Sequence, residues 1–158
     1  MSERGIVVSI HLAQAGGAPV REVAEARAVA GKGLDGDRYF SGTGTYSKAI
    51  HHPRREATLI ESEALEALER DYGIELAPGA SRRNIMTRGV GLNHLVGREF
   101  TIGAVRFRGV QLCEPCAYLQ KLTHAGVMRG LVNRGGLNAE ILTDGVIRAG
   151  DPISVPSD

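Results

Sequence analysis

Both cysteines of this chain lie three residues apart, in the segment QLCEPCAYLQK at residues 111–121. Such a pair could form half of a zinc site, a redox dithiol, or one reactive thiol beside an inert one. A structural zinc site normally needs four cysteine or histidine ligands at paired spacings. A thioredoxin-like dithiol would need a strand–helix–strand context, which the flanking sequence lacks. The histidines do not supply paired spacings either, because two are adjacent and the others are scattered: His11, His51, His52, His94 and His124.

Cys116 is the better candidate for a single working thiol. Pro115 suits the first position of a helix, and CAYLQKL can continue that helix for a turn or two. Cys116 would then lie in the first helical turn, where exposed N–H groups and the helix dipole stabilise a thiolate. Cys113 would remain on the preceding strand, packed as a small apolar residue. We therefore expect Cys116 to be the nucleophile or the metal ligand.

The segment SRRNIMTRG at residues 81–89 combines arginines and an asparagine around a short expected strand. Guanidinium groups match the geometry of phosphate, and an asparagine amide can hydrogen-bond the edge of a heterocycle. A second arginine pair follows the adjacent histidines. Together with a reactive thiol, these clusters would suit an anionic cofactor, and the candidate contact residues are Arg55, Arg82, Arg83, Asn84 and Arg88.

The segment GKGLDGDRYF at residues 31–40 resembles a phosphate-binding loop only superficially. It contains neither Gly-Lys-Ser/Thr nor Gly-x-Gly-x-x-Gly. Asp35 and Asp37 also lack the spacing of a calcium-binding loop. We expect a tight turn whose aspartate and arginine join neighbouring strands or line the rim of a pocket.

Length and composition predict a single domain over residues 1–158, with a core that needs no metal or disulfide. The net charge is +1 and aromatic residues make up 4%, so we expect no stable nucleic-acid binding. The apolar run from Ile6 to Ile10 is too short for a signal peptide or a membrane span. We therefore expect a cytoplasmic protein without a membrane partner.

Short β-branched or apolar segments between glycine-rich turns predict most of the strands. Asp144-Gly145 lies between two apolar runs and predicts a hairpin. The pattern favours a mainly β (α+β) fold, a closed or nearly closed β-barrel with a few short peripheral helices. The expected strands lie at residues 5–13, 56–61, 83–87, 98–103 and 138–142, with a last strand after the turn at 150–152.

Only the segment ESEALEALERDYG at residues 61–73 has clear helical periodicity. Ser62 is the expected N-cap and Gly73 the expected end of this helix. Leu65, Leu68 and Tyr72 fall on one face of this helix.

The strand that leads to the cysteines changes phase at Gly109. Val105 and Phe107 alternate with arginines, whereas the apolar residues after Gly109 are Val110 and Leu112. This one-residue shift predicts either a β-bulge, a feature common beside active sites, or a simple strand end.

Six segments occur in order over nearly the whole chain: GLDGDRY, TLIESEAL, RRNIMTRGVGLNHLVGREFTIG, CEPCAYL, RGGLNAEIL and GVIRAGDPI. Each segment alone is weak, but the ordered set is specific. Together they resemble a stand-alone bacterial MOSC domain, a family named for the C-terminal domain of molybdenum-cofactor sulfurases. The resemblance implies a β-barrel-like fold that binds the molybdenum cofactor (molybdopterin) or handles sulfur for it.

The resemblance also implies roles for particular residues. In the mitochondrial amidoxime-reducing relatives, the second cysteine of the corresponding segment ligates molybdenum, and this role falls on Cys116. The Arg-x-Asn of the family's cofactor-binding segment matches Arg82 and Asn84. Small bacterial members reduce N-hydroxylated compounds with electrons from a partner reductase, so we expect a small-molecule N-hydroxylated substrate and an electron-donating reductase. The chain lacks the sulfurase domain, and no pyridoxal phosphate site is visible.

Two other functions stay open on the sequence. Cys116 could carry a persulfide and act in sulfur transfer, or the protein could be a non-catalytic carrier of the cofactor. Sulfur transfer predicts a labile extra sulfur on Cys116 and no bound molybdenum. A carrier predicts tight cofactor binding without turnover.

Overall fold

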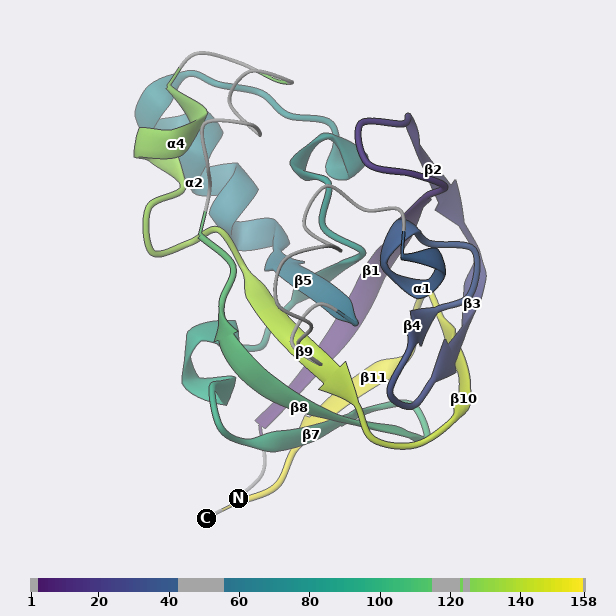
Figure 1. The fold of residues 1–158 in the computed structure, drawn as a ribbon. Coiled ribbons are helices and arrows are strands. Elements are labelled where there is room, and N and C mark those ends of the chain that lie inside the picture. Colours follow the sequence, from purple (N-terminus) through teal and green to yellow (C-terminus); the bar gives the residue numbers. More distant parts are fainter. Residues whose placement is uncertain (1–2, 43–55, 115–122, 124–125, 158) are drawn as a thin grey trace.

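The computed structural model describes residues 3–42, 56–114, 123 and 126–157, and strands dominate this part of the chain (Figure 1). No helix in these ranges is both long and apolar enough to cross a membrane. The helices are α1 (Arg38–Ser41), α2 (Ser62–Tyr72) and α4 (Val127–Gly130), with short 3-10 helices η2 (Pro78–Ser81) and η3 (Leu92–Leu95). The strands are β1 (Glu3–Ala13), β2 (Val20–Val23), β3 (Glu25–Val29), β4 (Gly33–Leu34), β5 (Ala57–Glu61), β6 (Ile85–Arg88), β7 (Glu99–Ile102), β8 (Val105–Leu112), β9 (Leu137–Ile141), β10 (Gly145–Arg148) and β11 (Pro152–Val155).

Seven of the described strands close into a barrel, which confirms the predicted fold class. Their order is β11-β7-β8-β9-β5-β6-β1, and β1 pairs with β11 to complete the ring. β5 and β6 run parallel, and the other neighbours in the ring run antiparallel. Because the first and last strands pair, the start of β1 and the end of β11 lie together at one end of the barrel (Figure 1). Closure removes the exposed sheet edges that an open sheet of this size would have.

The barrel interior is filled by alternate side chains of its strands. Val105 and Phe107 of β8 are buried, as predicted, and the arginines between them are exposed. Phe107 stacks on Phe100 of β7 with ring centroids 5.5 Å apart. Since neighbouring residues of a strand point to opposite faces, every second residue points outside the barrel. The candidate site is built on these outward-facing positions.

The predicted β-bulge at Gly109 is confirmed. The register between β8 and β9 shifts between Gly109 and Gln111. Gly109 is also required sterically, because a Cβ there would lie 2.1 Å from the carbonyl oxygen of Leu95 in η3. The bulge switches which face of the strand successive side chains point to. It lies three residues before Leu112, the last residue of β8, after which the chain continues to the cysteines.

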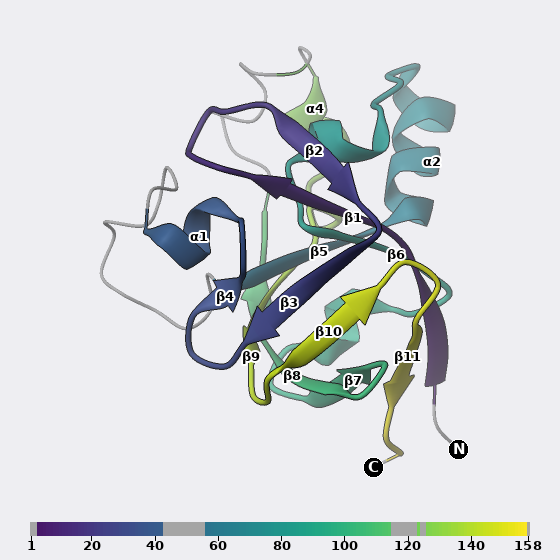
Figure 2. The same cartoon turned by 90° about the vertical axis from the view of Figure 1, so that its right-hand side faces the viewer.

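The predicted hairpin at Asp144-Gly145 is wrong. β9 pairs with β5 and β8, whereas β10 pairs with β3 in a separate sheet of order β10-β3-β4. Figure 2 shows this small sheet beside the barrel. Asp144 accepts a hydrogen bond from the Ala30 backbone N–H at 2.8 Å, and so joins the chain between the sheets to the end of β3. A turn signal cannot show which sheet the following strand enters.

The predicted helix at residues 61–73 is confirmed as α2, with one difference. Gly73 ends it in the left-handed conformation, at φ 66°, but the N-cap is Glu61 and makes no side-chain cap bond. Tyr72, on the same face as Leu68, is 47% exposed. The buried face is formed by small residues and Leu68, which pack on outward-facing Ile60 and Met86 of the barrel.

Candidate functional site

Arg82 makes the turn that leads from η2 into the barrel strand β6. It adopts the left-handed conformation, with φ 62°, at the end of η2. This conformation costs a residue other than glycine about 1–2 kcal/mol, so surrounding contacts must hold it. One such contact is the bond from Arg82 Nη1 to the carbonyl oxygen of Ala18, at 2.8 Å. The half-buried guanidinium therefore lies beside the turn between β1 and β2.

Asn84, the residue just before β6, connects the strands β5 and β1 through its side chain. Its Oδ1 accepts hydrogen bonds from the backbone N–H of Thr58 at 3.0 Å and from the Thr58 hydroxyl at 3.1 Å. Its Nδ2 donates to the carbonyl oxygen of His11 at 3.1 Å, across on β1. Asn84 is fully buried. The described bonds of its side chain thus connect β5 to β1, and a direct cofactor contact from Asn84 stays a prediction.

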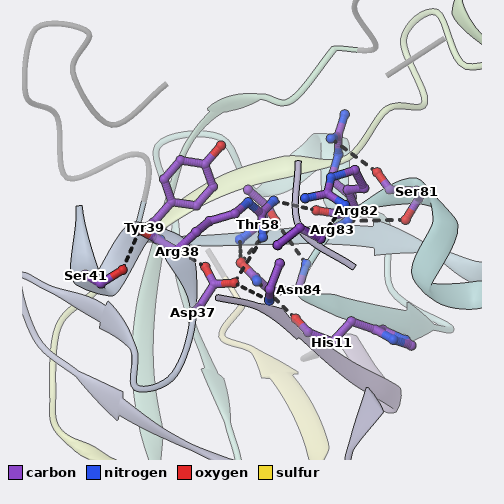
Figure 3. Close-up of polar contacts among 12 residues, drawn as sticks. His11, Asp37, Arg38, Tyr39, Ser41, Thr58, Ser81, Arg82, Arg83 and Asn84 are labelled. Atoms are coloured by element: carbon purple, nitrogen blue, oxygen red, sulfur yellow. Dashed lines mark hydrogen bonds and ion pairs between the residues drawn. The ribbon is translucent and has the colours of Figure 1, made fainter. Parts of the chain in front are cut away.

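Asp37 and Arg38 hold the same region from the other side (Figure 3). Asp37 accepts hydrogen bonds from the Ala13 backbone N–H at 3.1 Å and from Arg38 Nη1 at 3.0 Å. Arg38 Nη2 donates to the carbonyl oxygen of Arg82 at 2.9 Å. Both side chains are buried, so the pair is shielded from water. This confirms that the GKGLDGDRYF segment joins neighbouring strands, and it fixes the backbone of Arg82.

Arg83 connects the Arg-x-Asn segment to the cysteine segment. Its Nε donates to the carbonyl oxygen of Gly135 at 2.7 Å, and its Nη2 donates to the carbonyl oxygen of Cys113 at 3.0 Å. These acceptors lie on two different loops, one before β9 and one after β8. A single planar guanidinium can make both bonds because its donors form a rigid fork.

Cys113 extends the β8–β9 ladder by one residue past the end of β8. Its backbone N–H donates to the carbonyl oxygen of Gly136 at 2.8 Å, and its half-buried thiol forms no disulfide with any residue described. The next residue, Glu114, accepts a hydrogen bond from the Asn133 backbone N–H at 3.1 Å. The chain that leads to Cys116 is thus fixed up to Glu114 by the loop that precedes β9.

The structure brings together some of the predicted site residues and not others. Arg82, Arg83 and Asn84 lie together at the start of β6. Arg88 lies at the other end of that strand, where Nη1 bonds Ser62 Oγ at 3.0 Å and also Glu66 of α2. Cys116 and Arg55 are outside the described residues. Among the residues described, no three His, Cys, Asp or Glu side chains gather into a metal-binding group.

Sequence reasoning missed Asn138, which lies on the outward face of β9. Its register partners are Thr58 on β5 and Gln111 on β8, so the three side chains point to the same face. Asn138 is 2% exposed, and its Oδ1 has no hydrogen-bond partner in the described part of the chain. A polar residue at an even position of LNAEI signals an outward-facing side chain, but the strand pattern does not signal its burial.

A hollow of about 530 Å³ lies on the other side of Arg82, between the β1–β2 hairpin and η2. His11 lines it and is buried, with Nε2 bonded to the Ser9 hydroxyl at 2.8 Å. Burial lowers the pKa of His11, and the negative charge of Glu22 partly opposes this shift. The imidazole is therefore favoured in its neutral form.

A larger groove of about 650 Å³ lies between α2, η3 and the loop before β9. Its carboxylates and one arginine already have partners. Glu61 accepts from the Leu92 backbone N–H, Glu63 from that of Gly89, and Arg70 pairs with Asp71. We place the candidate site at Arg82 and Arg83 despite the smaller hollow there, because Arg83 connects the Arg-x-Asn segment to the cysteine segment.

Comparison with known proteins identifies this barrel. Residues 46–154 match the family model described as the MOSC domain, so the chain belongs to the MOSC domain family. The YuaD protein from Bacillus subtilis has a similar structure, with a TM-score of 0.85 at 15% identity over 100% of this chain and 98% of that one. YiiM from Geobacillus stearothermophilus has a TM-score of 0.71 at 17% identity, over 97% of this chain and 75% of that one. YiiM from Escherichia coli has a TM-score of 0.68 at 19% identity, over 100% of this chain and 71% of that one. No curated protein matches the chain.

Proposed function

We propose that this MOSC domain protein binds the molybdenum cofactor through Cys116 and reduces N-hydroxylated small molecules. The observation that carries this proposal is the pair of hydrogen bonds from Arg83 to the carbonyl groups of Cys113 and Gly135, which lie on two different loops. It ties the family's Arg-x-Asn segment to the chain that leads directly to Cys116. A thiol presented beside fixed arginines is the donor set that an anionic, thiolate-ligated metal cofactor requires.

The described residues fit such a group on chemical grounds. Arg82 and Arg83 supply guanidinium donors for phosphate or pterin oxygens. Asn138 supplies a buried carbonyl oxygen, on the same barrel face as Thr58, that has no partner among the residues described. An unpaired buried acceptor costs about 1–3 kcal/mol, and a ligand N–H group could remove this cost. Asp37, Arg38 and Asn84 keep the Arg82 backbone in place.

When bound, the cofactor would supply a metal centre able to exchange two electrons and an oxygen atom with an N–O bond. The reaction would consume the N-hydroxylated compound, two electrons and two protons, and would release the amine and water. A partner reductase would supply the electrons. The protein's own part would be to ligate through Cys116, to orient the cofactor with its arginines, and to limit access of water.

The turnover of phenylhydroxylamine to aniline with a chemical reductant tests this proposal. We expect the protein from a cofactor-competent host to be active and Cys116→Ser to be inactive but folded. Cys113→Ser should lose much less activity, because the hydrogen bonds of Cys113 given above use its backbone, which serine retains. Retained turnover in Cys116→Ser would contradict the ligand role. A labile extra sulfur on Cys116, in protein without molybdenum, would point to sulfur transfer instead.

A further inference from the structure

The hollow beside Arg82 has the features of a binding site for a small, mostly apolar group. Its volume of about 530 Å³ lies within the range usual for ligand pockets, about 300–1,000 Å³. Pro19, Val20 and Pro78 form apolar walls. Glu22 and Arg82 contribute charges of opposite sign, so the hollow carries no strong preference for an ion.

His11 supplies a polar atom on the wall of this hollow. The residue is 4% exposed, and Nε2 is bonded to Ser9. Among the described residues, Nδ1 has no hydrogen-bond partner. A Cβ on Gly79 would lie 3.0 Å from this nitrogen, so a glycine lets η2 lie directly over the imidazole. Figure 3 shows the ring pointing away from the Asp37–Asn84 cluster.

The position of the hollow links it to the proposed cofactor segment. Arg82 lines it, and Arg82 belongs to the Arg-x-Asn segment. Thr123 also lines it, and this residue follows Cys116 by seven positions. The hollow is therefore lined by a residue of the Arg-x-Asn segment and by a residue that follows the cysteine segment.

We propose that this hollow receives the organic body of the substrate, a neutral and mostly apolar group such as an aryl ring, with one hydrogen-bonding edge against His11. The inference rests on the proposed function, in which the N–O group of the same substrate is reduced. His11 and the apolar walls would then determine which N-hydroxylated compounds bind well, whereas Cys116 and the arginines would serve every substrate alike.

Two substrates that differ only by an aryl ring test the inference kinetically. Hydroxylamine has no organic body, and phenylhydroxylamine adds one phenyl group. Ala80→Phe fills the hollow from η2, and His11→Phe removes the polar edge. We expect each variant to raise KM for phenylhydroxylamine about tenfold, the loss equivalent to about 1.4 kcal/mol of binding. Turnover of hydroxylamine should stay within about twofold of wild type, since a twofold change is only about 0.4 kcal/mol.

A tryptophan reporter tests binding without any cofactor. The chain contains no tryptophan, so Ala77→Trp places a single fluorophore at the rim of the hollow. Titration of the cofactor-free variant with phenylhydroxylamine should change its fluorescence saturably. Adding His11→Phe or Ala80→Phe should weaken the response about tenfold. Tyr72→Trp on α2 is the matched control and should not respond.

The outcomes separate this inference from the proposed function. Saturable binding at Ala77→Trp in a protein that never carries molybdenum would support the hollow and contradict the reductase. The protein could instead turn over hydroxylamine, give no fluorescence response and keep its KM for phenylhydroxylamine in both variants. That result would contradict the proposed role of the hollow but not the proposed function. If His11→Phe does not fold, the Ala80→Phe results decide, because that variant leaves the Ser9–His11 bond intact.

Discussion

Nη2 of Arg83 lies 3.0 Å from the carbonyl oxygen of Cys113, a residue 30 positions further along the chain. The same guanidinium also bonds Gly135, so one side chain connects β6, the end of β8 and the start of β9. This connection means that the position of the cysteine segment depends on Arg83. Changes at Arg83 should therefore affect cofactor retention as well as the stability of the barrel.

Replacement of Arg83 by methionine tests this dependence. We expect Arg83→Met to lower the molybdenum and pterin content of the purified protein about tenfold, as for the loss of one or two charge-assisted hydrogen bonds. The free energy of unfolding should fall by about 1–3 kcal/mol. Arg106→Met is the control, because Arg106 pairs with Glu99 on an exposed part of the barrel. Equal cofactor content in both variants would argue against a role for Arg83.

Asn138→Leu should separate stability from cofactor binding. Removing an acceptor that has no partner among the described residues should leave the thermal stability of the cofactor-free protein unchanged or higher. The matched variant Thr58→Val should lower it, because the Thr58 hydroxyl bonds Asn84 in both directions. Asn138→Leu should nevertheless retain less pterin than wild type. A clear loss of stability in the cofactor-free Asn138→Leu protein would show that this side chain serves the fold.

Gly136→Ala should be severely destabilising. Gly136 has a φ of 115°, and a Cβ would lie 2.0 Å from the carbonyl oxygen of Leu59. The combined backbone strain and overpacking should cost about 2–5 kcal/mol in the free energy of unfolding. Gly97→Ala separates the two causes, because Gly97 also has a positive φ, 79°, but a Cβ there would meet no atom of the described residues within 4 Å. For Gly97→Ala we expect a loss of about 1–2 kcal/mol in the free energy of unfolding, measured by urea denaturation. Similar losses at both sites would contradict a steric clash at Gly136.

Glu56 should make the protein less stable as pH rises. Burial raises the pKa of Glu56, although hydrogen bonds from the Ile141 and Gly31 backbone N–H groups oppose the shift. The folded state then binds the proton more tightly than the unfolded state. Its contribution is fully present below the ordinary glutamate pKa and is lost as pH rises through the raised value. Glu56→Gln removes this titration while keeping Oε1 as an acceptor.

The stability of Glu56→Gln relative to wild type should therefore increase from acidic to neutral pH and then level off. Urea denaturation of both proteins over a pH series measures this difference. A difference that does not change with pH would show that Glu56 titrates alike in the folded and unfolded states.

The barrel could be predicted from sequence because its strands follow local rules. The alternation at Val105 and Phe107 and the phase change at Gly109 both reflect side chains that must face a core or a neighbouring chain. The partner of β10 could not be predicted, because strand pairing depends on residues far away in sequence. Arg82, Arg83 and Asn84 were found by residue type, but their different bonds follow from the left-handed turn at Arg82. The burial of Asn138 and the hollow at His11 arise only when several strands meet.

The most direct measurement is the molybdenum and pterin content of protein made in a cofactor-competent host, by elemental analysis and fluorescence of the oxidised pterin. Wild type from a cofactor-deficient host and Cys116→Ser from the competent host are the controls. We expect near-stoichiometric molybdenum and pterin in wild type and the loss of both in both controls. Folded wild-type protein that contains neither would contradict the proposed cofactor binding.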